Sequence, residues 1–203
     1  GSYTFYVRVR DAQGNEDDSP ASFTFVVDTA PPTDINLSIR GLSSQRRIEI
    51  SGGDAYTASR TVELQLQATD AADVWLSNDP DFSTGTWEPL DPIRRWELRE
   101  GDGNKTVWGK FRDAAGNLSA VISASILLDS TPPEPVSRVF DEGEQSQSSA
   151  LNFHWDAATD LSGIQGYHVQ LARDPEFRTV IYEGTVNENR VQVSKTQGVT
   201  RSG

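Results

Sequence analysis

The chain has 203 residues, and its 18 basic and 30 acidic side chains give a formal net charge of −12 at pH 7. We expect no nucleic-acid partner, because proteins that bind nucleic acid use clustered Lys and Arg to neutralise phosphates. The lack of cysteine excludes a disulfide framework and cysteine-ligated zinc, and no apolar run approaches the roughly 20 residues of a membrane-spanning helix, so no membrane insertion of this segment is expected.

Residues 1–31 are predicted to form the last two strands of a β-domain and a linker. Apolar and polar residues alternate along 3–10, which is typical of a strand with one buried face. The sequence Asp-Ala-Gln-Gly-Asn at 11–15 predicts a turn, since glycine accepts a positive φ and Asp can bond the local backbone. The paired prolines within 28–32 lack amide donors and are expected to end the second strand.

Residues 32–134 are predicted to form one complete sandwich. The same alternation occurs along 61–68 and 106–112. The segment 112–117 repeats the turn sequence of 10–15, and the segment 129–133 repeats the Pro-Pro linker. We therefore place the domain boundaries near residues 31 and 133.

Residues 135–203 are predicted to hold the first strands of a further domain, through about the fifth. Ala-Thr-Asp at 68–70 recurs at 158–160, and the pattern of 74–82 recurs at 169–177. These matches indicate a period of roughly 100 residues, the size of one immunoglobulin-like sandwich. The missing last strands would be supplied by an equivalent of 1–31.

The strand, turn and linker sequences "YVRVRDAQGN…FVVDTAPP" and "VWGKFRDAAGN…ILLDSTPP" resemble bacterial Ig-like and fibronectin type III-like repeats. The resemblance implies an all-β fold of tandem sandwiches, one complete and one split between the two termini. It also implies an extracellular or cell-surface location and a structural or adhesive role, with other copies or flanking repeats as partners.

An incomplete sandwich exposes an apolar face and an unpaired strand edge, so each of the two pieces is expected to need a complement. Three arrangements remain open: a continuous tandem array, head-to-tail strand donation between molecules, and closure within one chain or a swapped dimer. The first two would build a fibre. The residues expected at the donated interface are Tyr3, Phe5, Val7, Val9, Phe23 and Phe25.

Catalytic residues are not predicted. The sequence shows no nucleophile motif, and His154 and His168 follow strand alternation beside aromatic residues. We expect no organic cofactor and no enzymatic activity.

Calcium is the one cofactor that the sequence suggests, because Ca²⁺ prefers hard oxygen ligands from loops rich in Asp. The alternative is that these turn carboxylates face water and accept hydrogen bonds from local amides. The candidate ligands are Asp11, Asp28, Asp70, Asp113, Asp129 and Asp160.

A second functional hypothesis is a carbohydrate- or ligand-binding accessory module of a secreted enzyme. Aromatic side chains can stack on sugar rings, although in such sandwiches they more often pack in the core. The pattern places Trp96 and Trp155 inward, and Trp108 with Tyr6 on a wet or half-wet face. The tryptophans concerned are Trp75, Trp87, Trp96, Trp108 and Trp155.

Overall fold

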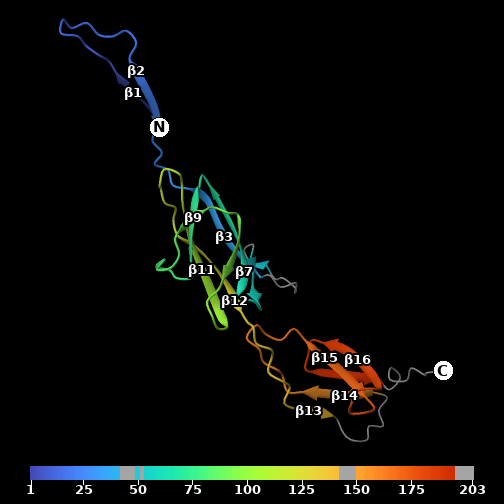
Figure 1. The fold of residues 1–203 in the computed structure, drawn as a ribbon. Helices are drawn as coiled ribbons and strands as arrows, with labels where there is room; N and C mark the ends of the chain where they lie inside the picture. The colour runs from blue at the N-terminus through green and yellow to red at the C-terminus, as the bar shows by residue number, and fades with distance from the viewer. Residues whose placement is uncertain (42–48, 51–52, 142–149, 195–203) are drawn as a thin grey trace. The chain divides into compact units, whose positions relative to one another are not determined.

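The computed structural model describes residues 1–41, 49–50, 53–141 and 150–194 (Figure 1). These residues form β-strands joined by turns and contain no helix. The described part therefore includes no helix able to cross a membrane. The predicted all-β class is confirmed, and several sheets of the kind found in β-sandwiches are present. The chain divides into an N-terminal unit, Gly1–Leu128, and a C-terminal unit, Asp129–Gly203.

The N-terminal unit begins with a two-stranded hairpin of β1 (Ser2–Val7) and β2 (Ala21–Val26). Alternating side chains of a strand point to opposite faces, and directly opposed residues share a face. Tyr3 lies opposite Phe25, and Phe5 lies opposite Phe23. One face of the hairpin is therefore aromatic, as the alternation predicts.

Two larger sheets follow in the N-terminal unit. The first has the order β10–β7–β3 and the second has the order β6–β12–β11–β8–β9. The strands of the first sheet are β3 (Thr33–Gly41), β7 (Thr61–Thr69) and β10 (Ile93–Glu97). Those of the second are β6 (Tyr56–Thr57), β8 (Asp73–Ser77), β9 (Trp87–Pro89), β11 (Gly103–Arg112) and β12 (Ile122–Leu128). A short pair, β4 (Glu49–Ile50) with β5 (Gly53–Asp54), is separate from both.

The core of the N-terminal unit follows the predicted alternation. On β7 the alternate residues Val62, Leu64 and Leu66 are buried and those between them are partly exposed, and Val107 and Phe111 of β11 follow the same pattern. Phe111 is the largest of the fully buried side chains. The buried core cluster consists of Leu37, Ile39, Val62, Leu64, Leu66, Val74, Leu76, Leu98, Val107, Phe111 and Ile126.

The C-terminal unit has two smaller sheets with the orders β13–β14–β17 and β15–β16. The strands are β13 (Val139–Asp141), β14 (Ala150–Trp155), β15 (Tyr167–Ala172), β16 (Val180–Val186) and β17 (Arg190–Ser194). Its buried cluster among the described residues consists of Trp155, Val191 and Val193. This core is much thinner than that of the N-terminal unit.

The described sheets of the C-terminal unit match part of the N-terminal unit in strand order. The sheet β13–β14–β17 corresponds to β3–β7–β10, with the second strand in the centre of both. The pair β15–β16 corresponds to β8–β9, and both are antiparallel. The described residues of the C-terminal unit contain no strands in the places of β6, β11 and β12.

Candidate functional site

The hairpin β1–β2 has the same turn as the hairpin β11–β12. Gly14 donates its amide to the carbonyl of Asp11 at 3.1 Å, and Gly116 donates to that of Asp113 at 3.2 Å. The two glycines have φ angles of 92° and 93°, which glycine adopts without a steric penalty. The turn predicted from the sequence Asp-Ala-x-Gly-Asn is thus confirmed in both places.

The two hairpins also have the same strand register. The segment 16–20 after the first turn has one residue more than the segment 118–121 after the second. When the turns are aligned and this insertion is allowed for, each opposed pair of β1–β2 falls on an opposed pair of β11–β12. The matching pairs are Tyr3–Phe25 with Lys105–Ile126, Phe5–Phe23 with Val107–Ala124, and Val7–Ala21 with Gly109–Ile122.

The two hairpins differ in burial. All residues of β1 and β2 are exposed, whereas the inward residues of β11 and β12 form part of a core. The matched positions, with exposed fractions, are Phe5 (63%) and Val107 (0%), Val9 (70%) and Phe111 (0%), Phe25 (42%) and Ile126 (1%), and Val27 (41%) and Leu128 (1%). The β1–β2 hairpin therefore carries the side chains of a core without the core.

Strand β1 is also shorter than β11 at its end near the turn. Residues Lys110, Phe111 and Arg112 pair with β8 and lie beyond the part of β11 that pairs with β12, although Arg112 also forms an isolated bridge with Leu118. Their counterparts at 8–10 lie beyond β1, which ends at Val7. The difference follows from the absence of a strand in the place of β8 beside β1.

Strand β15 of the C-terminal unit has the complementary deficiency. It pairs with β16 only, whereas β8 pairs with both β9 and β11. Val74 and Leu76 of β8 are buried, but Val169 and Leu171 of β15 are only half-buried. The described part of this unit thus presents one edge of β15 that no strand covers, and the inward residues of β15 are only partly buried against the core cluster of the facing sheet.

Phe177 shows the same deficiency next to β15. Phe82 and Phe177 have nearly equal positive φ angles of 55° and 54°, and each donates its amide to the carbonyl of the Asp three residues earlier. Phe82 is 8% exposed and lies 4.4 Å from the Lys110 ammonium of β11, while Phe177 is 51% exposed. Phe82 also packs against Trp75, with ring centroids 6.0 Å apart, so Phe177 lacks the counterparts of both Lys110 and Trp75.

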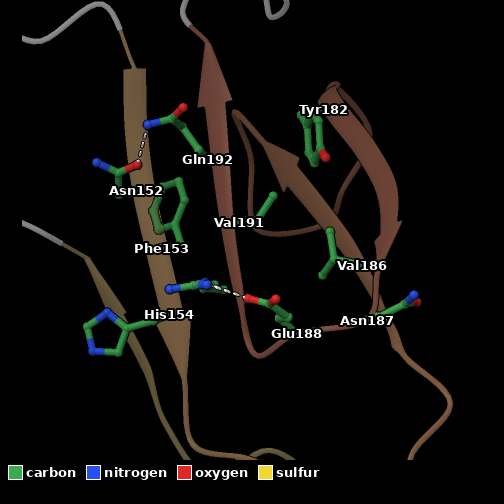
Figure 2. A pocket seen from close by; sticks show the side chains of 10 residues that line it. Asn152, Phe153, His154, Tyr182, Val186, Asn187, Glu188, Val191 and Gln192 are labelled. Atoms are coloured by element: carbon green, nitrogen blue, oxygen red, sulfur yellow. Dashed lines mark hydrogen bonds and ion pairs between the residues drawn. The ribbon is translucent and has the colours of Figure 1, made fainter.

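Two grooves open between the sheets of the C-terminal unit. One, of about 420 Å³, is lined by Phe177, Val169, Leu171 and core residues that include Trp155. The buried Trp155 Nε1 has no hydrogen-bond partner among the described residues. The other groove, of about 950 Å³, is lined by residues of β14, β16 and β17 (Figure 2). Its apolar residues labelled in Figure 2 are Phe153, Val191, Val186 and Tyr182.

The structure places the six donation residues on the β1–β2 hairpin or beside it, all exposed. Sequence reasoning did not identify the receiving residues Val169, Leu171 and Phe177. The repeated pattern at 169–177 contained all three and was the signal available for finding them.

The candidate calcium ligands are spread over both units. Among the described residues, no group of three or more His, Cys, Asp or Glu side chains could hold a metal ion. The expectation that these acids face water is wrong for Asp113 and Asp129, which are 3% and 8% exposed. Their carboxylates lie against the backbone of the turns and linker that they cap.

Local N–H groups donate to five of these carboxylates. Asp11 and Asp113 each accept bonds from the backbone and side-chain amides of the Asn four residues later. Asp28 accepts from Ala30 N at 3.0 Å. Asp70 is exposed and has a φ of 61°. Ser162 N lies between two of the six carboxylates, at 2.8 Å from Asp129 and 2.9 Å from Asp160.

These hydrogen bonds stabilise the charged form of the turn carboxylates. The Asn117 side-chain amide lowers the pKa of Asp113 below its ordinary value of 3.8, and the amide of Asn15 does the same for Asp11. The Ser162 hydroxyl and amide lower the pKa of Asp129.

We expect the stabilisation by Asp113 to depend on pH. Because its pKa is lower in the folded chain, the ionised carboxylate stabilises the fold at pH values above 3.8, and this contribution is lost as the pH falls through the lowered folded pKa. Asp113→Asn should therefore lower the Tm of the N-terminal unit at about pH 7 and lower it by a smaller amount at a pH well below 3.8. Thermal unfolding followed by circular dichroism tests this, and an equal loss at both pH values would contradict it.

The five tryptophans do not form one platform. Trp75 and Trp87 pack edge to face with ring centroids 5.6 Å apart, and the Lys110 ammonium lies 4.4 Å from the Trp75 ring. Trp96 donates its indole N–H to Asn78 Oδ1 at 2.9 Å, and Trp155 is buried. Trp108 is half-buried, as predicted for the outer face of its strand.

The two histidines lie on exposed positions of different strands. The His154 ring stacks on Phe140 at 4.8 Å, and His168 Nε2 lies 2.9 Å from Glu183 Oε1. Both contacts are those of residues on a sheet surface.

The fold and these surfaces define an all-β protein with unpaired strand edges. No family model matches the chain, and no curated protein shows significant sequence similarity to it.

Proposed function

We propose that this chain is a non-enzymatic structural or adhesive repeat protein of the cell surface or extracellular space. Its domains are Ig-like or fibronectin type III-like sandwiches, each completed by a hairpin of the β11–β12 type. The N-terminal unit contains one whole sandwich, and the β1–β2 hairpin is the closing hairpin of another. The assembled form is a fibre, built as a tandem array or by head-to-tail donation.

The observation that supports this proposal is the contrast between the two hairpins. The same turn and register occur once within a core and once fully exposed. An isolated two-stranded hairpin is marginally stable in water, and burying a Phe or Val side chain stabilises by about 1.5–3 kcal/mol. The exposed apolar face is therefore a surface built for a complementary sheet.

The proposal predicts that assembly depends on one face of β1. Phe5 and Tyr6 are neighbours on opposite faces and have nearly equal exposed fractions of 63% and 62%. Phe5→Arg would place a charge at a position whose counterpart is fully buried, at a cost of several kcal/mol. We expect it to abolish assembly, whereas Tyr6→Arg should largely preserve it.

Sedimentation over a range of protein concentrations, with negative-stain imaging, measures this effect. Wild-type chains are expected to form concentration-dependent linear assemblies. A wild-type chain that stays monomeric at all concentrations, or equal behaviour of the two variants, would contradict the assembled form proposed here.

A further inference from the structure

We propose that the unpaired edge of β15 binds the β1–β2 hairpin of a second copy of this chain. The strands run antiparallel, with Val9 of the donor opposite Val169 and Val7 opposite Leu171. This inference rests on the proposed function and specifies the interface through which copies join.

The register comes from the N-terminal unit, where β11 and β8 form the equivalent contact. Phe111 lies opposite Val74, and Gly109 lies opposite Leu76. In the hairpin, Val9 is the counterpart of Phe111 and Val7 is that of Gly109. In β15, Val169 is the counterpart of Val74 and Leu171 is that of Leu76. The docked hairpin would thus direct its apolar face into the 420 Å³ groove that Val169 and Leu171 line.

The segment 8–10 is the part of the donor that would pair with β15. Its counterparts Lys110, Phe111 and Arg112 are strand residues paired with β8. In the free hairpin this segment lies outside β1, although Val9 N is held by Asp17 Oδ2 at 2.8 Å as Phe111 N is held by Ser119 Oγ at 2.9 Å. Docking would extend β1 through Arg10, so both unpaired edges gain backbone hydrogen bonds.

The charges of the two surfaces are complementary. In the N-terminal unit, the Lys110 ammonium lies 4.4 Å from the Phe82 ring and 5.7 Å from the Trp87 ring. In the proposed interface Arg8 takes the place of Lys110, and Phe177 takes that of Phe82. Glu183 occupies the position of Trp87, since it lies opposite Gln170 as Trp87 lies opposite Trp75. Arg8 would therefore stack on an exposed ring and exchange its ion pair with Glu16 for one with Glu183. It would join the contacts that His168 and Gln170 make with that carboxylate.

A second copy is the occupant that satisfies both deficiencies with a single kind of contact. The same chain carries an uncovered hairpin and an uncovered β15 edge, so each copy can donate one and receive the other. Such a heterologous contact does not close on itself and continues as a linear assembly.

Cysteine cross-linking between two separately tagged chains tests the register, and the absence of native cysteine leaves no competing thiol. Arg10 is the counterpart of Arg112, which lies opposite Asp73, and His168 is the counterpart of Asp73. Arg10→Cys in one chain and His168→Cys in the other should give a disulfide-linked heterodimer, because opposed Cα atoms lie about 4.5–5.5 Å apart. The matched control is Thr185→Cys. Thr185 lies on β16, opposite His168 of β15, so it is one strand farther from the donor and about 10 Å from the donor cysteine.

With His168→Cys as the acceptor, we expect a reducible heterodimer of two 22.3 kDa chains. With Thr185→Cys as the acceptor, the yield of this heterodimer should be at least tenfold lower. Equal yields with the two acceptors, or linkage only between chains of the same kind, would overturn the register. If linkage fails while the wild-type chain still assembles, this interface is wrong and the proposed function stands. If the wild-type chain remains monomeric, the assembled form itself is wrong.

A charge exchange provides a second test that leaves the apolar face intact. Arg8→Glu should weaken assembly about tenfold by facing Glu183, and Glu183→Arg in the receiving chain should restore it. Additive losses in the double variant would overturn the proposed pairing of Arg8 with Glu183.

Discussion

Replacing Phe111 by alanine is expected to lower the free energy of unfolding of the N-terminal unit by about 3–5 kcal/mol. Its ring is fully buried in the middle of the core, against both sheets' apolar residues. Removal of the ring loses its transfer free energy and leaves a cavity that the surrounding strands can fill only in part. Urea unfolding, followed by the fluorescence of the four tryptophans of this unit, measures the loss.

Val9 supplies the matched comparison, because it occupies the position of Phe111 in the other hairpin. Its side chain is 70% exposed, so Val9→Ala should change the stability of dilute, unassembled chains by less than about 0.5 kcal/mol. The same change should weaken assembly if Val9 is buried at the contact. A large loss in dilute chains would show that the hairpin is already covered.

The elements of the fold with regular alternation were predictable from the sequence. Along 61–68 and 106–112 the structure buries the positions predicted to face inward, apart from Ala68, which is half-buried, because strand side chains alternate between two faces. The Asp-Ala-x-Gly-Asn turns were predictable for a local reason, since one glycine and one Asp satisfy the turn without tertiary contacts. The predicted all-β class follows from the same two signals.

The exposure of the hairpin was expected from the split repeat, but the residues that would receive it were not identified, because their exposure depends on strands distant in the sequence. Val9 and Phe111 occur in the same local pattern, yet one is exposed and the other fully buried. Phe82 and Phe177 share a turn and a φ angle, but Trp75 and the Lys110 ammonium pack against the ring of Phe82 alone. The repeated pattern at 169–177 aligns the receiving residues with β8, but the uncovered edge is apparent only in the fold, where β8 has a strand on both sides and β15 has one.

The burial of Asp113 and Asp129 was missed for a related reason. An Asp in a turn predicts solvent contact when only composition is considered. In the fold, the amides that these carboxylates accept from belong to the turn itself or to a neighbouring loop, so the backbone covers the side chain. A capped turn and a metal-binding turn use the same residue types, and only the directions of the N–H groups distinguish them.

A synthetic peptide of residues 1–31 is expected to stabilise the C-terminal unit of the full chain. The receiver is the Phe5→Arg variant, whose own hairpin is disabled while β15 is unchanged. A ligand that binds only the folded state stabilises it by about 2.7 kcal/mol at a free concentration one hundred times Kd. The added strand would bury Val169, Leu171 and Phe177, which the free unit leaves partly or largely exposed.

Hydrogen exchange of the backbone amides of β15 measures this stabilisation at the strand that would bind the peptide. Exchange there is expected to slow by about 100-fold at that peptide concentration, because each 1.4 kcal/mol corresponds to a factor of ten. The same peptide carrying Phe5→Arg is the control and should leave the rates unchanged. Protection by both peptides, or by neither, would mean that β15 does not receive the hairpin, since the two peptides differ only in a side chain whose counterpart Val107 is fully buried.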